Sequence, residues 1–430
     1  MLLNLPRAYE VMDRHGLDGL VAVDPINVYY LTDYWGPLMR MRRTFYNYAV
    51  LPRAEDQPAG IVVNGIELTR LGLQPEATWV PNRCGYLHPI YKDRRDFDPD
   101  VEDPEAIEHA MQWPVNLETL SPSEEKYLAA VEASRGRHSA NALYGLKRAL
   151  KDAGLSRAVV GSDDPRIGPW LHQVGLEGVE VRDAYSVFRE IRMVKSPAEL
   201  DLLRTAAKMN EAALDKTLEQ LAPGVRMGDL QNAYAAEIAA GGGRSVYLAT
   251  GHTAARNPDG RVVEGLPVTF DALCEFRNYH GDVGRTAVCG EPSAELVRRM
   301  QAVRVGAEIA YGMIRPGVTG NEVTTALVEG VRKAGFPGYL FATPHSVGLE
   351  HSDHPLPIGP TLPGGEGQFV FLEDMVFTID MPYRELGWGN LHSEDQLRVT
   401  ADGIEPLTSC DPSLRVRPGG NRGAGVPHRH

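Results

Sequence analysis

Residues 268–288, VTFDALCEFRNYHGDVGRTAV, carry two aspartates eleven positions apart, Asp271 and Asp282, among apolar and β-branched residues. A β-hairpin that turns at Phe276–Arg277 or one residue later places both carboxylates on one face, directly opposite or on the neighbouring diagonal, because side chains alternate along each strand. Two carboxylates this close repel each other. The pair therefore requires either a shared proton or a bound cation.

Three further residues favour the cation. His345 lies in the segment ATPHSVGLEH, Asp380 in MVFTIDMPY and Glu394 in NLHSEDQLRVT, each at the end of a β-rich stretch. Four carboxylates and one imidazole are suitable ligands for a pair of divalent ions, which prefer hard oxygen donors and accept borderline nitrogen. The sequence therefore predicts a metal site in the carboxyl-terminal half.

At these positions the chain resembles the pita-bread metallopeptidases, the family of prolidase, aminopeptidase P, methionine aminopeptidase and creatinase. The resemblance covers roughly residues 190–405 by ordered motifs, and the first 180 residues resemble the creatinase-type amino-terminal domain. It implies two divalent ions (manganese, iron, cobalt or zinc). The implied ligands Asp, Asp, His, Glu and Glu fall on Asp271, Asp282, His345, Asp380 and Glu394, with the fourth shortened to Asp.

A repeat supports the same fold. The helical segment 202–225 and a second helical stretch from Leu296 both end in Pro-Gly-Val, and Ser196–Glu199 forms a capping box before the first. The resemblance implies an internal αββ duplication. We expect an α/β amino-terminal domain (1–190), an α+β pita-bread catalytic domain (191–410) and a disordered tail (411–430). In the first domain, segments 17–34, 46–53, 60–65 and 158–164 read as strands or strand ends and 124–153 as helix.

Composition narrows the class of protein. The chain has 430 residues with 43% hydrophobic content, and neither a membrane-spanning apolar run nor a signal peptide is evident. Four scattered cysteines do not fit a disulfide framework or a zinc ribbon, and we expect a cytoplasmic protein. A net charge of -13 argues against nucleic acid as a partner. The resemblance alone implies a homodimer.

Two bridged cations lower the pKa of a shared water and hold a hydroxide for attack, while one ion polarises the substrate carbonyl. In the family the residue at the position of Asp380 is the usual general acid/base, and we assign that role to Asp380.

Several positions depart from the peptidase pattern. The second histidine of the family, seven residues after the ligand histidine, is Ser352 here, with His351 and His354 on either side. In an extended strand His351 would point to the opposite face from residue 352.

An earlier family histidine has no clear counterpart, and His252 lies nearby; the arginine two residues before the last ligand is His392. We expect His252, His354 and His392 to contact substrate. The loop 35–43 is either an exposed arginine-rich loop or a segment that closes the site and binds a substrate carboxylate through Arg42.

Two classes of function follow. The first is a metal-dependent hydrolase that cleaves Xaa-Pro peptides or a related small amide. The alternative is a lyase or hydrolase of small non-peptide metabolites, as in dimethylsulfoniopropionate lyase, creatinase or ectoine hydrolase, which resemble prolidase in fold; there His351 would act as a base. A binding protein on an inactive enzyme fold is the third interpretation, which the retained ligands disfavour.

Overall fold

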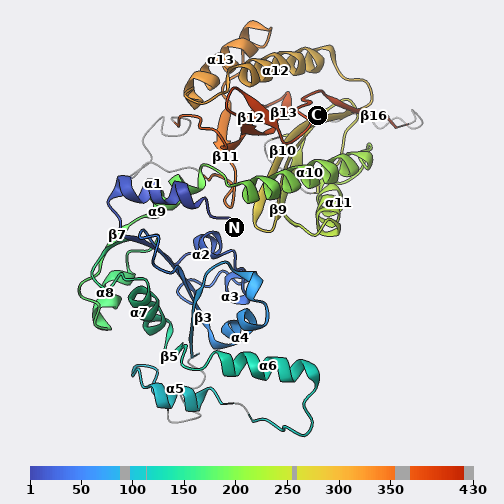
Figure 1. Cartoon of the computed structure of the whole chain (residues 1–430). Helices are drawn as coiled ribbons and strands as arrows, with labels where there is room; N and C mark the ends of the chain where they lie inside the picture. Colours follow the sequence, from blue (N-terminus) through green and yellow to red (C-terminus); the bar gives the residue numbers. More distant parts are fainter. Residues whose placement is uncertain (88–96, 113, 254–258, 354–368, 421–430) are drawn as a thin grey trace. The chain divides into compact units, whose positions relative to one another are not determined.

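The computed structural model describes residues 1–87, 97–112, 114–253, 259–353 and 369–420. The chain divides into two units, residues 1–191 and 192–430 (Figure 1). Within the described residues, no helix combines the length and the apolar character needed to cross a bilayer.

The amino-terminal unit is an α/β domain built on one mixed sheet. The sheet has the order β5-β4-β3-β2-β1-β6-β7, with β2 antiparallel to both of its neighbours and the other pairs parallel. Its strands are β1 (Gly19–Ala22), β2 (Tyr48–Pro52), β3 (Gly60–Asn64), β4 (Asn82–Tyr86), β5 (His138–Ser139), β6 (Val159–Ser162) and β7 (Glu180–Asp183). Its helices are α1 (Leu5–His15), α2 (Pro25–Thr32), α3 (Pro37–Arg40), α4 (Gly65–Leu73), the 3₁₀ helix η1 (Pro75–Ala77), α5 (Pro104–Ala110), α6 (Pro122–Ala133), α7 (Ala142–Asp152), α8 (Ile167–Gln173) and α9 (Tyr185–Arg192).

Two sequence-based expectations for this unit are wrong in detail. The segment 17–34 is not strand throughout, because α2 follows β1 after two residues. Asp24 caps α2 by accepting a hydrogen bond from the backbone N–H of Ile26, and Pro25 occupies the first turn. The expected helix 124–153 is two helices, α6 and α7, with the short strand β5 between them.

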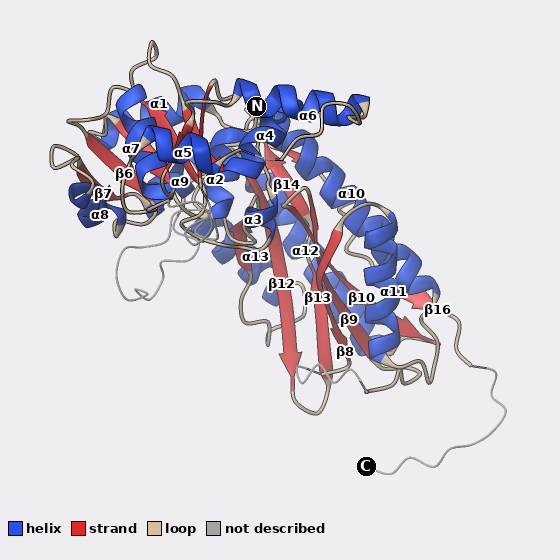
Figure 2. Ribbon diagram, turned by 90° about the horizontal axis from the view of Figure 1, so that it is seen from below, coloured by secondary structure: helices blue, strands red, loops and turns tan. Residues whose placement is uncertain are grey.

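The carboxyl-terminal unit repeats one pattern twice, as the predicted duplication requires. Two helices and three strands come first, namely α10 (Pro197–Glu219), α11 (Met227–Ala240), β8 (Arg244–Gly251), β9 (Pro267–Phe276) and β10 (Tyr279–Cys289). The second copy is α12 (Ala294–Met313), α13 (Gly320–Lys333), β11 (Thr343–Ser346), β12 (Val376–Glu385) and β13 (Gly389–Ser393), followed by β14 (Gln396–Val399), β15 (Ile404–Pro406) and β16 (Arg415–Arg417). In both views the strands lie side by side with the helix pairs on their outer faces (Figures 1 and 2).

Helix α10 begins as the sequence predicts. Ser196 accepts a hydrogen bond from the Glu199 backbone N–H, while the Glu199 carboxylate accepts one from the Ser196 backbone, so both groups of the capping box are satisfied. Further along α10, the buried amide of Asn210 donates to the backbone carbonyls of Ala272 and Gly281. The helix is therefore fixed on the β9–β10 hairpin by polar as well as apolar contacts.

Residues 411–420 correct the expectation of a disordered tail from 411 onward. Strand β16 pairs in parallel with the end of β10, where Val416 lies opposite Val288. Composition could not reveal this pairing, because the ladder uses the backbone N–H and C=O groups that Arg415, Val416 and Arg417 carry like any other non-proline residues. The last ten residues of the tail lie outside the described part of the chain.

Candidate metal centre

The β9–β10 hairpin sets the positions of the two aspartates. It turns at Arg277–Asn278, and both residues have positive φ, as a two-residue type I′ turn requires. Asp271 pairs with Gly284 and Asp282 with Leu273, so the carboxylates share one face on a diagonal. Of the two turns that the sequence allowed, the structure has the later one, and of the two arrangements it has the diagonal one rather than the directly opposed one.

Glu394 reaches the hairpin through a backbone bridge. The N–H groups of Gly284 and Glu394 each donate to the other's carbonyl, at 3.1 and 3.0 Å. A Cβ atom on Gly284 would lie 2.8 Å from the Cβ of Glu394, so this close approach requires glycine. The bridge joins the two αββ halves where their carboxylates meet.

Strands β11 and β12 supply His345 and Asp380. Thr343 pairs with Asp380 and His345 with Thr378, and the His345 ring nitrogen Nε2 lies 3.0 Å from the Thr378 hydroxyl. The Asp380 carboxylate accepts hydrogen bonds from His392 Nε2 (2.7 Å) and from the Thr343 hydroxyl (3.2 Å). Asp380 is therefore held from both sides by neighbouring side chains.

Six side chains of the centre form two groups of three. Within each group, the atoms that could bind a metal ion lie within 4.8 Å of one another. The first cluster is Asp271, His392 and Glu394, and the second cluster is Asp282, His345 and His351. Glu394 faces both, because its Oε2 lies 3.6 Å from His392 Nε2 and its Oε1 lies 3.6 Å from His345 Nε2. Glu394 therefore lies between the two clusters.

Buried oxygen atoms at the centre fit divalent cations. Both carboxylate oxygens of Asp282 and Oε1 of Glu394 are buried and make no hydrogen bond within the described structure. Burial and the neighbouring carboxylates of Asp282 and Asp380 raise the pKa of Glu394 well above its usual value. Buried carboxylates without hydrogen bonds are costly, and a divalent ion removes that cost.

His392 and Asp380 form an ion pair within the centre. Burial alone would lower the pKa of His392, but the Asp380 carboxylate and the other acids raise it to about 10. Burial opposes ionisation of Asp380 as well, yet the charge of His392 holds the pKa of Asp380 below its usual value. Without bound metal, His392 is thus a cation among acids.

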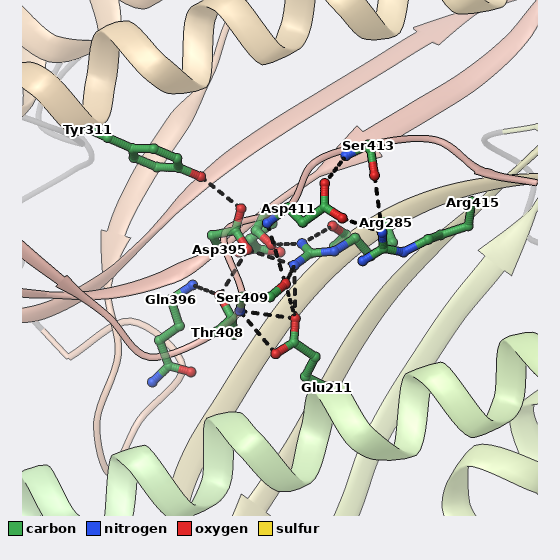
Figure 3. A network of polar contacts seen from close by, with 12 residues as sticks. Glu211, Arg285, Tyr311, Asp395, Gln396, Thr408, Ser409, Asp411, Ser413 and Arg415 are labelled. Carbon is green, nitrogen blue, oxygen red and sulfur yellow. Dashed lines mark hydrogen bonds and ion pairs between the residues drawn. The ribbon is translucent and has the colours of Figure 1, made fainter.

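A polar network around Arg285 and Asp395 lies next to the metal centre in the sequence (Figure 3). The buried guanidinium of Arg285 donates to the Glu394 carbonyl at 2.7 Å and to the Asp395 carboxylate at 2.7 Å. Asp395 also accepts hydrogen bonds from Tyr311 and Thr408. Such outer groups fix the direction of a ligand side chain.

His351 joins the second cluster although an extended strand would have turned it away. Strand β11 ends at Ser346, and the chain then curves back so that the Asp353 N–H donates to the Ser346 carbonyl. The His351 Nε2 atom lies 3.2 Å from Asp282 Oδ2. The extended-strand geometry that would turn residue 351 to the face opposite residue 352 therefore does not hold for this segment, and His351, a predicted catalytic residue, lies beside Asp282.

The remaining predicted residues lie elsewhere. His252 accepts a hydrogen bond from the Val263 N–H and donates to the Pro267 carbonyl, so both ring nitrogens serve the backbone rather than the clusters. Arg42 belongs to the amino-terminal unit, where its guanidinium carbon lies 5.9 Å from the centre of the Trp35 ring. His354 lies outside the described residues. Substrate contact by these three residues stays a prediction.

A pocket of about 150 Å³ adjoins the first cluster. Its lining includes Thr269, Asp271, Asp380, Arg384, Asn390 and His392. Arg384 was not predicted, although the alternation along β12 places it on the same face as Asp380.

Tyr247 on β8 was also missed. It pairs with Leu273, two residues after Asp271, and therefore shares the face of Asp271 and Asp282. Burial and the Asp271 carboxylate raise the pKa of this phenol. The same alternation, carried from the hairpin to the preceding strand, would have identified it.

Comparison with known proteins places this centre in a family. The model of metallopeptidase family M24 matches residues 201–401, and that of the creatinase/prolidase N-terminal domain matches residues 5–84. A probable dipeptidase PepE of Mycobacterium tuberculosis is 30% identical over 288 residues, which are 64% of this chain and 74% of the relative. The chain belongs to metallopeptidase family M24. The predicted family is confirmed.

Other proteins similar to this M24 metallopeptidase are named dipeptidases. The Xaa-Pro dipeptidase of Pyrococcus furiosus is 23% identical over 244 residues, covering 55% of this chain and 68% of the relative. The solved structure of an Xaa-Pro dipeptidase from Bacillus anthracis superposes with a TM-score of 0.67 at 17% identity, covering 96% of this chain and 98% of that one. Dipeptidase PepE from Mycobacterium ulcerans gives 0.65 at 21% identity, with 96% and 97% covered. These likenesses confirm the predicted two-domain pita-bread fold.

Proposed function

We propose that this protein is a metal-dependent peptidase that cleaves Xaa-Pro dipeptides with two divalent ions, drawn from manganese, iron, cobalt and zinc. The observation that carries the proposal is the pair of clusters with Glu394 facing both, in a chain whose similar proteins include an Xaa-Pro dipeptidase. Asp271, Asp282, His345, Asp380 and Glu394 are the proposed ligands.

The chemistry divides between the ions and the chain. When bound, divalent ions supply a water of lowered pKa and polarise the scissile carbonyl. Asp380 lies between two hydrogen-bond donors, His392 Nε2 and the Thr343 hydroxyl, at the edge of the 150 Å³ pocket. From there its carboxylate would take the proton that the attacking water loses and pass it to the leaving amine, the role of a general acid/base.

The pocket supports a short substrate. Its volume holds about one small residue, and Arg384 at its edge brings a positive charge toward the first cluster. A dipeptide leaves a free carboxylate one residue beyond the scissile bond, and a guanidinium pairs well with that group. Arg384 is therefore the proposed anchor for the substrate's carboxyl terminus.

Hydrolysis of Ala-Pro and Gly-Pro tests the proposal, with manganese, cobalt, zinc or iron added to the purified protein. We expect turnover by the wild type and its loss in Asp282→Ala, because Asp282 lies in the second cluster. Asp201→Ala changes a side chain that is 79% exposed and serves as the matched control. No turnover of any proline peptide with any of these metals would remove the peptidase proposal. The screen should then turn to small betaines and cyclic amides, the alternative substrates.

The proposal also includes a cytoplasmic homodimer. All four cysteines are free and three are buried, which suits a reducing compartment. The family resemblance supports the dimer. Light scattering on the purified protein measures its mass, and a monomer would contradict this part of the proposal.

A further inference from the structure

We propose that His351 and His392 are metal ligands, so that the two-ion centre holds three imidazoles, with His345, instead of one. This inference rests on the proposed two-ion function and adds to its five ligands. It assigns a coordinating role to two histidines where the family pattern places other residues.

His392 is built into the first cluster. Its buried ring places Nε2 at 2.7 Å from Asp380 Oδ1 and 3.6 Å from Glu394 Oε2, and Asp271 completes the cluster. The ring fits because residue 284 is glycine, where a Cβ would lie 2.8 Å from His392 Cε1. The Thr286 hydroxyl also fixes the backbone of His392: it accepts a hydrogen bond from the backbone N–H and donates one to the backbone carbonyl, both at 2.8 Å.

The shortened fourth ligand explains why nitrogen is needed there. The carboxyl group of Asp380 stands one methylene farther back than that of a glutamate, and in the structure both of its oxygens accept hydrogen bonds, from His392 and Thr343. The His392 nitrogen extends from this pair toward Glu394. In a metal-loaded centre His392 Nε2 would serve as a nitrogen donor in place of its hydrogen bond to Asp380.

His351 completes the second cluster from the loop that follows β11. Its Nε2 lies 3.2 Å from Asp282 Oδ2, and its ring centre lies 4.5 Å from that of His345. The loop is fixed on both sides of His351. The His280 N–H donates to the Gly348 carbonyl at 2.9 Å, and Asp353 binds two buried cations, Arg192 and Lys195.

A centre with three imidazoles differs chemically from one with a single imidazole. Carboxylate-rich sites suit manganese, whereas added imidazoles favour zinc and iron. The inferred ligand set therefore moves metal preference toward these ions.

X-ray absorption spectroscopy of the full-length protein loaded with cobalt counts histidine rings at the metal without relying on activity. We expect three histidines for every two cobalt ions, and one for every two would overturn the inference. This wild-type measurement does not depend on any variant folding. One histidine for every two cobalt ions, together with intact hydrolysis of Ala-Pro, would refute only the ligand assignment. Three histidines at the metal without hydrolysis would refute only the proposed function.

Variants assign the two residues separately. His351→Gln and His392→Gln should each lower cobalt affinity in calorimetric titration by more than the roughly tenfold to hundredfold loss that follows removal of a ligand's hydrogen-bonding partner. His15→Gln, a half-exposed histidine of the amino-terminal unit, is the control and should bind cobalt as the wild type does. Wild-type affinity together with an unchanged ring count in either glutamine variant would overturn the assignment of that residue.

Discussion

Asp353 should be among the most costly residues to truncate in the carboxyl-terminal unit. Its carboxylate is fully buried and accepts hydrogen bonds from Arg192 Nε at 2.8 Å and Lys195 Nζ at 2.9 Å, and both of these cations are 1% exposed. Asp353→Ala would leave two buried positive charges with less compensation. Breaking a buried ion pair from one side costs about 3–5 kcal/mol.

This cost translates into a measurable melting shift. For a unit of this size each kcal/mol lowers the melting temperature by about 2–4 °C, so Asp353→Ala should melt roughly 6–20 °C below the wild type. Chelator-treated protein should be used, because bound metal would add its own stabilisation. Differential scanning calorimetry and urea denaturation both measure the effect.

Asp201→Ala provides the comparison for the same chemical change. Asp201 pairs with Arg204 at 3.1 Å but is 79% exposed, and such surface pairs contribute less than about 1 kcal/mol. The reasoning predicts a clear separation between the two variants. If Asp353→Ala costs no more than Asp201→Ala, the buried charges do not hold the loop that carries His351.

Three further predictions concern pH, space and charge. Burial raises the pKa of Glu199 to about 7 from its ordinary 4.5, so the native state keeps this proton at pH values where the unfolded chain loses it. The unfolding free energy should therefore fall as pH rises between those two values, and Glu199→Gln should flatten this dependence in urea titrations; an unchanged slope would contradict it. Gly284→Ala should lower cobalt affinity at least about tenfold with the fold retained by circular dichroism, because the new methyl group meets His392 and Glu394; wild-type affinity would show that the site adapts. Arg384→Ala should raise KM for Ala-Pro about 10–100-fold, because one charge-assisted hydrogen bond to the substrate carboxylate is lost. KM for Ala-Pro amide, which lacks that carboxylate, should stay unchanged, and equal effects on both substrates would refute the carboxylate anchor.

The β9–β10 hairpin could be predicted because the sequence pattern that indicates it is local. Side-chain alternation and the spacing of Asp271 and Asp282 fix which face the carboxylates share, and the turn leaves only two registers to consider. The capping box at Ser196 is local in the same way. Patterns of this kind depend on neighbouring residues alone.

The missed features have identifiable causes. Helix α2 is buried along its whole length, and a short apolar run without alternation does not distinguish helix from strand. Asp24 and Pro25 were the available signals for a helix. The backbone path that brings His351 to Asp282 could not be predicted, because β11 ends where Asp353 binds Arg192 and Lys195, about 160 residues earlier in the chain. Contacts of that range leave no local pattern.

The register of the β9–β10 hairpin limits how this segment can change during evolution or engineering. An insertion or deletion of a single residue within the strands, between either aspartate and the turn, would rotate one carboxylate to the opposite side of the sheet. Extra residues at Arg277–Asn278 would leave the ladder intact, because that connection lies beyond the last paired residues. Tags, loops or grafted peptides are therefore tolerated at the tip of this hairpin and excluded from its arms.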